Sequence, residues 1–434
     1  MNQDDLQKAK EAMSRKDMAT TLVWARKHLA ANPGHVEAAT MVARALADEA
    51  PDTAVSTLQR AIADNKEAQA KLALTCELLP YLEQTRRAAH GLPPYHVLDM
   101  REFPFHFCHA EIEGVRQMWK SFAGDAATTL NMGPAVEFIL GNLAAADSLL
   151  LRTAETAKNK RAPGSFATVR YAPEFYKNLD NVDLRGLPEV QVLKQAQFST
   201  QHVLFVGCNL DYLQLFAVPL LRSLAAKAPG ADAHVHLMVV EGQSHPQIPS
   251  LDLNLHITYE VIHKGLDSPM YYHAMRLVRF YQFLQDRALW MADVDGLLNS
   301  DPGPLYARLQ SGVGIRVHPG RVQPWNQFNA SLVAAAPDSK DYFRLVANYI
   351  AHFMLAGNFT WGMDQMALYG VYQYLERKPQ LTLWSPSDFA QYECDDDAVF
   401  WFTAGALKNE YARGALPPPP QHKKYWDAFQ KYAQ

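Results

Sequence analysis

Two aspartates one residue apart, Asp293 and Asp295, end a hydrophobic run in the stretch LWMADVDGLLNSDP at 289–302. In an extended strand, residues i and i+2 point to the same side, so a strand that continues to its surface would aim both carboxylates at one point. Mg²⁺ and Mn²⁺ prefer oxygen ligands and often bind one or two carboxylates together with substrate phosphates. The pair therefore suits a metal ion and a diphosphate, although acidic residues are also common in ordinary turns.

The segments around this pair predict an α/β sheet. Runs rich in β-branched and aromatic residues at 202–209, 233–242, 255–263 and 288–296 alternate with helical patterns at 213–229 and 271–286. Such alternation predicts parallel strands. Ligands of open α/β sheets bind beyond the carboxyl ends of the strands. Because VGCNLDY (206–212) and ADVDG (292–296) both stand at such ends, we expect them to line one pocket.

The amino-terminal region has a different, helical pattern. The stretch from Asn32 to Asn65 carries small residues at Ala43, Ala54 and Ala61 that would let two antiparallel helices approach closely. It resembles a tetratricopeptide repeat, whose period is about 34 residues; a generic helical hairpin bundle is the alternative. Stacked helix pairs form grooves for peptides or protein surfaces. We therefore expect this region to bind a protein, either a substrate or a partner, and a scaffold role is equally compatible.

These patterns predict four parts of the chain. Residues 1–90 form tetratricopeptide-like helical repeats, and residues 91–162 form a connecting region of helix and loop. Residues 163–415 form the α/β domain, and residues 416–434 form a proline-rich linker and a helix. Tyr425, Trp426 and Phe429 on that last helix are expected to pack against the body of the protein.

Composition excludes several classes of function. The chain of 434 residues has 41 basic and 45 acidic residues and a net charge of −4, which is not the basic balance of a nucleic-acid-binding protein. Its four cysteines form no CxxC pair, which argues against structural zinc and for a reducing compartment. Its polar start and the lack of an apolar run of about 20 residues predict a cytoplasmic protein without a membrane span.

From about residue 200 to 410 the chain resembles the retaining glycosyltransferases of family 8, which have a GT-A fold. VLFVGCNLDYLQLFAVPLLRSL (203–224) is similar to that family's first strand, uridine-binding turn and following helix. MRLVRF (275–280), FNASLVAAAP (328–337), WGMDQMAL (361–368) and FTAGALK (402–408) match later segments; Arg276 is the expected donor-contacting arginine and Arg279 the second choice. The resemblance assigns donor binding to Gly207, Asn209, Asp211, Tyr212, Arg276, Asn329, Gly405 and Lys408.

The resemblance implies transfer of a sugar from a UDP-sugar donor with retention of configuration. Mn²⁺ or Mg²⁺ would bind Asp293 and Asp295, and Lys408 would meet the β-phosphate as a positive charge. Asp364 and Gln365 would be the catalytic pair: Asp364 orients the sugar, and Gln365, a poor nucleophile, gives electrostatic support near the reacting carbon. Charges aimed at a departing group are often the largest contribution to catalysis.

The chain departs from the family at one position. Where the family has a histidine as the third protein ligand of the metal, this sequence has Phe402. Because phenylalanine cannot ligate, the ion is held by Asp293, Asp295, phosphate and water or by another side chain, or it is weakly bound, or the enzyme is inactive.

Two other functions remain open at the sequence level. DVDGLL (293–298) also resembles the motif of haloacid-dehalogenase-type phosphatases, in which Asp293 would be the nucleophile and Asp295 the general acid/base. That family places the motif on its first strand and usually has threonine or valine where this chain has Leu297; Asp395 to Asp397 would be its downstream acidic group. The third function is a non-catalytic partner-binding protein with a decayed transferase domain, which Phe402 favours.

Overall fold

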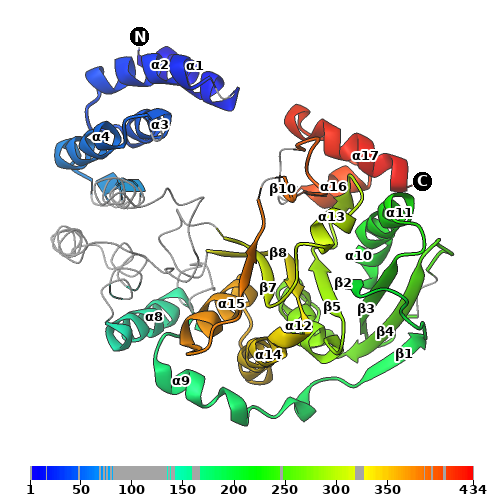
Figure 1. Cartoon of the computed structure of the whole chain (residues 1–434). Helices are drawn as coiled ribbons and strands as arrows, with labels where there is room; N and C mark the ends of the chain where they lie inside the picture. Colours follow the sequence, from blue (N-terminus) through cyan, green and yellow to red (C-terminus); the bar gives the residue numbers. More distant parts are fainter. Residues whose placement is uncertain are drawn as a thin grey trace. The chain divides into compact units, whose positions relative to one another are not determined.

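The computed structural model describes residues 2–81 and 167–433 with gaps, residues 142–158, and the single positions Pro134 and Glu137. The gaps fall at 16, 47–48, 68–69, 72–73, 75–76, 79–80, 245–247, 318–326, 386, 392–393 and 404–406. Gly405 and most of the predicted connecting region 91–162 therefore lie outside the described residues. The chain divides into two compact units, residues 1–162 and residues 163–318 with 325–434 (Figure 1).

The first unit is helical in its described part. Consecutive helices α1 to α4 pack each against the next. Ala43, Ala54 and Ala61 are fully buried, as the predicted close approach of helices requires. The Asn65 side chain donates a hydrogen bond to the Gly34 carbonyl at 2.5 Å, so the two predicted breaks of this hairpin meet. Assignment to the tetratricopeptide class stays a prediction. The helices are α1 (Asn2–Ser14), α2 (Met18–Ala31), α3 (Val36–Leu46), α4 (Pro51–Asp64) and α8 (Leu143–Lys158).

The second unit is built on an eight-stranded sheet with the order β1-β4-β3-β2-β5-β8-β7-β9, beside a three-stranded sheet with the order β10-β11-β6 (Figure 1). The strands are β1 (Val190–Lys194), β2 (His202–Asn209), β3 (Asp232–Val240), β4 (Asn254–Ile262), β5 (Ala288–Ala292), β6 (Gly296–Leu298), β7 (Val313–Val317), β8 (Phe328–Ala335), β9 (Leu381–Leu383), β10 (Phe389–Gln391) and β11 (Phe400–Phe402).

The sheet is mixed rather than parallel throughout. Strands β4, β3, β2 and β5 are mutually parallel, as the alternating pattern predicts. However, β1 joins β4 antiparallel, and β8 runs antiparallel to both β5 and β7. Only ten residues separate β7 from β8, fewer than the dozen or so that a parallel crossover needs. The parallel centre therefore has antiparallel neighbours on both sides.

Helices cover both faces of the large sheet, and β2 shows how its residues divide between them. Leu204 and Val206 belong to the apolar core that includes α11. Phe205, on the other face, packs edge-on against Phe280 of α12. The helices are α9 (Pro173–Lys177), α10 (Leu210–Tyr212), α11 (Val218–Lys227), α12 (Pro269–Phe283), α13 (Gly303–Tyr306), α14 (Lys340–Leu355), α15 (Met363–Tyr374), α16 (Lys408–Ala412) and α17 (Lys423–Ala433).

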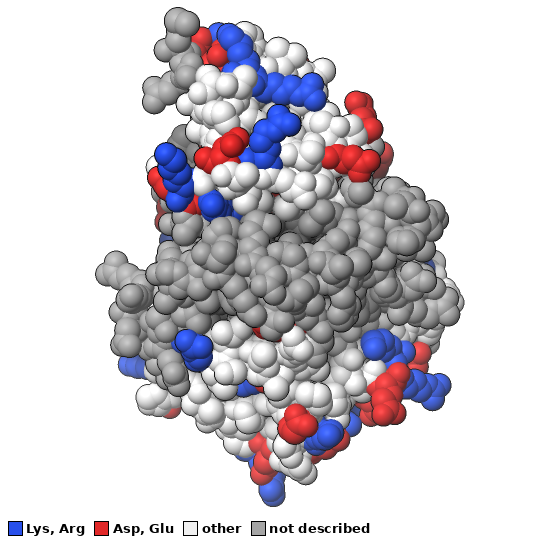
Figure 2. Space-filling model, turned by 90° about the vertical axis from the view of Figure 1, so that its left-hand side faces the viewer, with Lys and Arg blue, Asp and Glu red and all other residues white. Residues whose placement is uncertain are grey.

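The carboxyl-terminal helix α17 packs against α11 and α16. Its aromatic residues Tyr425, Trp426 and Phe429 are each at most 2% exposed, in agreement with the predicted docking. Among the described residues, no helix combines the length and the apolar character needed to cross a membrane. On the face drawn in Figure 2, acidic and basic side chains of the described residues are interspersed rather than separated by sign.

Candidate active site

The two aspartates lie in a tight turn rather than in a strand. Strand β5 ends at Ala292, and the chain turns through Asp293 and Asp295 before β6 begins at Gly296. The Asp293 N–H donates to the carbonyl of Ser331 at 2.7 Å, and the Gly296 N–H donates to the Asp293 carbonyl at 3.1 Å. The strand predicted over 288–296 therefore ends before the two aspartates, and the condition for both carboxylates to face one point is not met. The turn instead directs each carboxylate to a cation on a different helix.

Asp293 is paired with a buried arginine. Arg276 of α12 is 4% exposed. Its Nη1 donates to Asp293 Oδ1, and its Nε donates to the His273 carbonyl at 3.1 Å. Burial alone would raise the pKa of Asp293, but the charges of Arg276 and His273 outweigh burial, so the pKa lies below its ordinary value. Asp293 is thus an ionised carboxylate at neutral pH.

Glycine at position 207 is what allows this arginine to lie so close to the sheet. A Cβ added at Gly207 on β2 would lie 2.8 Å from the Cβ of Arg276. Glycine in a strand often marks such a close approach. The second-choice arginine, Arg279, lies elsewhere: its Nη2 pairs with Glu260 and donates to the Pro188 carbonyl at 2.6 Å. Arg276, and not Arg279, therefore reaches the turn of the two aspartates.

A third carboxylate contacts the same arginine. Asp364, in the first turn of α15, is fully buried, and its Oδ2 lies 3.4 Å from Arg276 Nη2 and 2.6 Å from His273 Nε2. Its Oδ1 accepts the N–H of Gln365 at 2.8 Å. Burial would raise the pKa of Asp364, but His273 and Arg276 lower it overall. Because Asp364 contacts Arg276, it acts on the turn through the arginine.

Asp295 pairs with the lysine that the sequence singled out. The Nζ of Lys408, at the start of α16, donates to Asp295 Oδ2. The same Nζ lies 5.4 Å from the ring centroid of Tyr212 and 5.8 Å from that of Phe216. Burial raises the pKa of Asp295, and Lys408 offsets only part of that effect. Burial would lower the pKa of Lys408, but Asp295 outweighs it, so the ammonium keeps its charge.

The predicted uridine-binding turn follows β2 and lies beside this lysine through Tyr212. Asn209 Oδ1 accepts the N–H of Tyr212 at 2.9 Å and caps the short helix α10. Asp211 is exposed. The Tyr272 hydroxyl donates to Asp267 at 2.6 Å, and burial together with that bond raises the pKa of Tyr272. The turn therefore presents half-buried polar groups at the carboxyl end of β2.

Strand β8 also contacts Arg276. The Ala330 carbonyl lies 3.4 Å from Arg276 Nη2, and Asn329 Oδ1 accepts the N–H of Ser331 at 2.8 Å. Asn329 is therefore next to the residues that hold Arg276 and Asp293. Gln365 is half-buried beside Asp364. The structure thus brings Gly207, Arg276, Asn329 and Asp364 close to Asp293, and Lys408 and Tyr212 close to Asp295. Gln365 contacts Asp364 through its backbone N–H, Asp211 is exposed, and Gly405 lies outside the described residues.

Two residues of this cluster, His273 and Tyr425, were not predicted from the sequence to belong to the site. His273 stands three positions before Arg276, a spacing that places both on one face of a helix, and this spacing could have identified it. Its ring stacks on Trp361, with centroids 4.7 Å apart, and Trp361 is 61% exposed. Tyr425 of α17 donates its hydroxyl to the Asp295 carbonyl at 2.8 Å. Nothing in the sequence signals that contact, because 130 positions separate the two residues.

The side chains at the aspartate turn are not well arranged as ligands of a divalent cation. Phe402 pairs with Gly296 across β11 and β6 and is 1% exposed in the apolar core. A Cβ at Gly296 would lie 2.6 Å from the Phe402 ring, so the ring occupies the space beside the turn. Within the described part of the chain, no three His, Cys, Asp or Glu side chains are grouped to hold a metal. Both aspartates are already engaged by Arg276 and Lys408.

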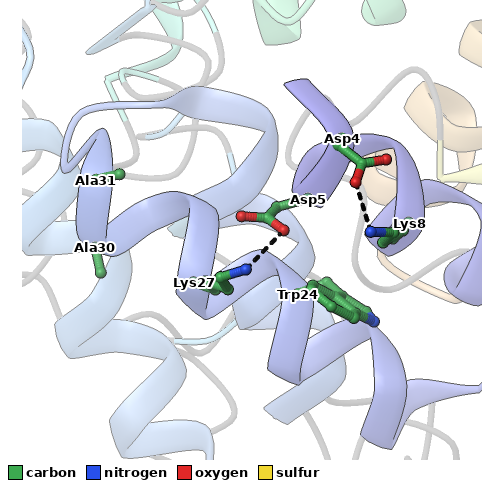
Figure 3. Close-up of a pocket in the computed structure, with 7 residues that line it drawn as sticks. All are labelled: Asp4, Asp5, Lys8, Trp24, Lys27, Ala30 and Ala31. Atoms are coloured by element: carbon green, nitrogen blue, oxygen red, sulfur yellow. Dashed lines mark hydrogen bonds and ion pairs between the residues drawn. The ribbon is translucent and has the colours of Figure 1, made fainter. Parts of the chain in front are cut away.

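A separate hollow lies in the first unit, between α1 and α2 (Figure 3). Lys8 pairs with Asp4 at 2.5 Å and Lys27 with Asp5 at 3.1 Å. Both ammonium groups lie over the Trp24 ring, 4.8 and 5.0 Å from its centroid. The charges that line this hollow are thus matched within the chain, and none of the predicted site residues belongs to it.

No protein-family model matches the chain, and no curated protein matches it significantly in sequence. Among solved structures, the chain is similar to the galactosyltransferase LgtC in complex with donor and acceptor sugar analogs, at 11% identity and a TM-score of 0.34, over 52% of this chain and 99% of that one. It is also similar to the glycosyltransferase GlyE of Streptococcus pneumoniae TIGR4, at 12% identity and a TM-score of 0.34, over 54% of this chain and 63% of that one.

A third similar structure is the bifunctional glycosyltransferase WbbM, at 11% identity and a TM-score of 0.32, over 54% of this chain and 52% of that one.

Proposed function

We propose that the second unit is a glycosyltransferase of GT-A type that moves a sugar from a UDP-sugar to an acceptor hydroxyl with retention of configuration. The observation that carries this proposal is the charged cluster at the carboxyl ends of β2 and β5, where Arg276 and Lys408 meet Asp293 and Asp295. Open α/β sheets bind their ligands at such ends. Two fixed cations there suit a diphosphate, whose charge grows as the sugar departs.

The residues around the cluster suit distinct parts of such a donor. Asn209 and Tyr212 would meet the nucleoside at the turn after β2, with exposed Asp211 at its edge. Asn329 and Arg276 would orient the sugar, and Asp364 would hold Arg276 in place. Gln365 would lie near the reacting carbon. Holding a donor in a reactive geometry lowers the barrier because the disorder is removed before the reaction.

The proposal also includes an acceptor and a cation. Packed helices α1 to α4 are consistent with a protein acceptor or partner, but they specify neither. Mn²⁺ or Mg²⁺ at Asp293 and Asp295 remains a prediction from the sequence, and binding it would require both carboxylates to leave their present partners.

Thermal unfolding with UDP, with and without Mn²⁺, provides the first test. A ligand that binds the folded state raises its apparent stability, so we expect UDP to raise the melting temperature. Hydrolysis of UDP-glucose, UDP-galactose and their N-acetylated forms would then identify the sugar. An absence of any shift, with no hydrolysis, would contradict the proposal and favour the non-catalytic alternative.

The phosphatase alternative has its own distinguishing result. Release of phosphate from phosphomonoesters, abolished by Asp293→Asn, would support it over sugar transfer. In the structure Asp293 is bound to Arg276 and follows β5, which β1 to β4 precede in the chain, whereas the phosphatase motif stands on the first strand.

A further inference from the structure

The charges at the proposed donor site are balanced by the chain itself. Asp293 and Asp364 share Arg276, Asp364 also bonds to His273, and Asp295 has Lys408. Each carboxylate therefore has its own positively charged or hydrogen-bonding partner. A divalent cation gains most from carboxylates that lack such partners, because it must otherwise compete with cations already in place.

The space beside the turn is closed to a further ligand by an aromatic ring. Phe402 is stacked on Phe400, with ring centroids 5.9 Å apart, and lies edge-on to Phe389 at 5.5 Å. Its close contact with Gly296 ties that ring to the aspartate turn itself. A polar side chain here would be buried among aromatic rings without a partner, which is costly. The position therefore contributes packing to the turn and no metal ligand.

Lys408 is placed to act on a ligand as well as on Asp295. Its side chain is 21% exposed, whereas that of Asp295 is 7% exposed. An ammonium group has three donors, so its hydrogen bond to Asp295 leaves capacity for phosphate oxygens. Its position near Tyr212 places it next to the turn that we assign to the nucleoside.

We propose that Lys408 meets the diphosphate at this site in place of a divalent cation, so that donor binding is independent of metal. The inference rests on the proposed function and specifies how that site works. In the reaction, the bond from the anomeric carbon to the diphosphate oxygen breaks and its electron pair stays on that oxygen. The acceptor oxygen bonds to the anomeric carbon, and the acceptor proton passes to the departing diphosphate.

The decisive measurement is UDP affinity of the full-length wild-type protein by calorimetry, in EDTA and in Mn²⁺. By linkage, a metal whose binding is strengthened by UDP raises UDP affinity by the same factor. We expect the two affinities to agree, and we expect no protein-bound Mn²⁺ signal by electron paramagnetic resonance with UDP present. A rise in UDP affinity of roughly tenfold or more with Mn²⁺ would overturn the inference while leaving the proposed function intact.

Variants of two lysines test the role of the ammonium. Lys408→Met should weaken UDP binding in EDTA by roughly tenfold or more, the loss of one charge-assisted hydrogen bond. Lys423→Met removes a lysine that pairs with Asp427 on α17 and should leave the affinity unchanged. Equal UDP affinity in Lys408→Met and wild type would contradict the proposal. If UDP binds wild type under neither condition, both the inference and the proposed function fail.

Discussion

Arg276 is the residue on which the largest number of site contacts converge. It is buried, and it links a carboxylate from the β5 turn to one from α15 and to a carbonyl of β8. A buried ion pair contributes little compared with a well-packed apolar pair, but removing one partner leaves the other charge unpaired. The arginine therefore matters for folding as well as for any ligand.

Replacing this arginine should therefore be costly. Arg276→Met keeps most of the side-chain volume but leaves Asp293 and Asp364 without their shared cation. We expect a loss of about 3–5 kcal/mol in the free energy of unfolding, measured by urea titration at neutral pH. Arg185→Met, which removes an exposed pair with Asp183, should not change the midpoint measurably. Equal midpoints for Arg276→Met and wild type would show that the buried contacts are not present.

A second prediction concerns the Cβ atom that Gly207 lacks. Its added Cβ would lie 2.8 Å from Arg276 Cβ, so Gly207→Ala must push α12 away from β2. We expect a loss of about 1–3 kcal/mol, as for other overpacked sites, together with weaker UDP binding. Gly265→Ala is the control, since the nearest atom to its added Cβ is a His263 side-chain nitrogen at 3.4 Å. An unchanged unfolding midpoint in Gly207→Ala would contradict this account of the close approach.

Helix α17 has a role that its place in the chain does not suggest. It is the last helix of the chain, yet it supports the turn that carries Asp293 and Asp295. Its apolar side chains form a core with Phe216 and Leu297, and Arg222 of α11 donates to the Tyr432 carbonyl at 2.8 Å. The helix thus joins α11 to the segment that carries Asp295. A linker rich in proline, residues 416–420, leads the chain to that position.

Removing one hydroxyl from this helix tests its support of the turn. Tyr425→Phe keeps the ring but removes a bond to the Asp295 carbonyl, which then keeps, among the described residues, the 3.3 Å bond from the Thr403 N–H. We expect a loss of roughly 0.5–1.5 kcal/mol in stability, measured by urea titration, and a lower UDP affinity measured by calorimetry. Tyr432→Phe on the same helix is the matched control. Tyr432 contacts α11 through its backbone carbonyl, which this substitution leaves in place. A result in which both variants behave alike would argue against a specific role of Tyr425.

On the scale of the whole molecule, the sheet contains a buried polar layer away from the proposed site. His234 and His236 of β3 lie 2.8 and 2.9 Å from the Thr258 hydroxyl, and His236 faces Glu260 at 3.8 Å. Burial lowers the pKa of both histidines, with neighbouring charge adding to the effect at His234. Both are therefore neutral in the folded protein at neutral pH.

This layer predicts how stability depends on pH. A histidine whose folded pKa lies below its unfolded value of about 6.5 binds a proton more readily when unfolded. Such a histidine stabilises the folded protein fully at pH values above its unfolded pKa. This stabilisation is lost as the pH falls toward its folded pKa. The free energy of unfolding should therefore decrease between neutral pH and about pH 5, measured by urea titration. His234→Gln should make the decrease smaller, and an equal decrease in both proteins would contradict the assignment.

Much of the local structure followed from the sequence alone. Alternation of β-branched runs with helical patterns located β2, β3, β4, β5 and α12 within a few residues, since side-chain periodicity is a local property. The proximity of the two strand ends also followed, because parallel neighbours end at the same edge of a sheet. The aromatic spacing on the last helix likewise predicted its docking.

Only the tertiary structure decided what the charged residues do to one another. The sequence placed Arg276, Asp293, Asp295 and Lys408 in the same region, but it could not show that each carboxylate is paired with a cation. Nor could it show that Phe402 fills the space beside Gly296, or that Tyr425 bonds to the Asp295 carbonyl. Pattern and spacing report on neighbours along the chain, whereas charge pairing depends on distances between segments that meet only after folding.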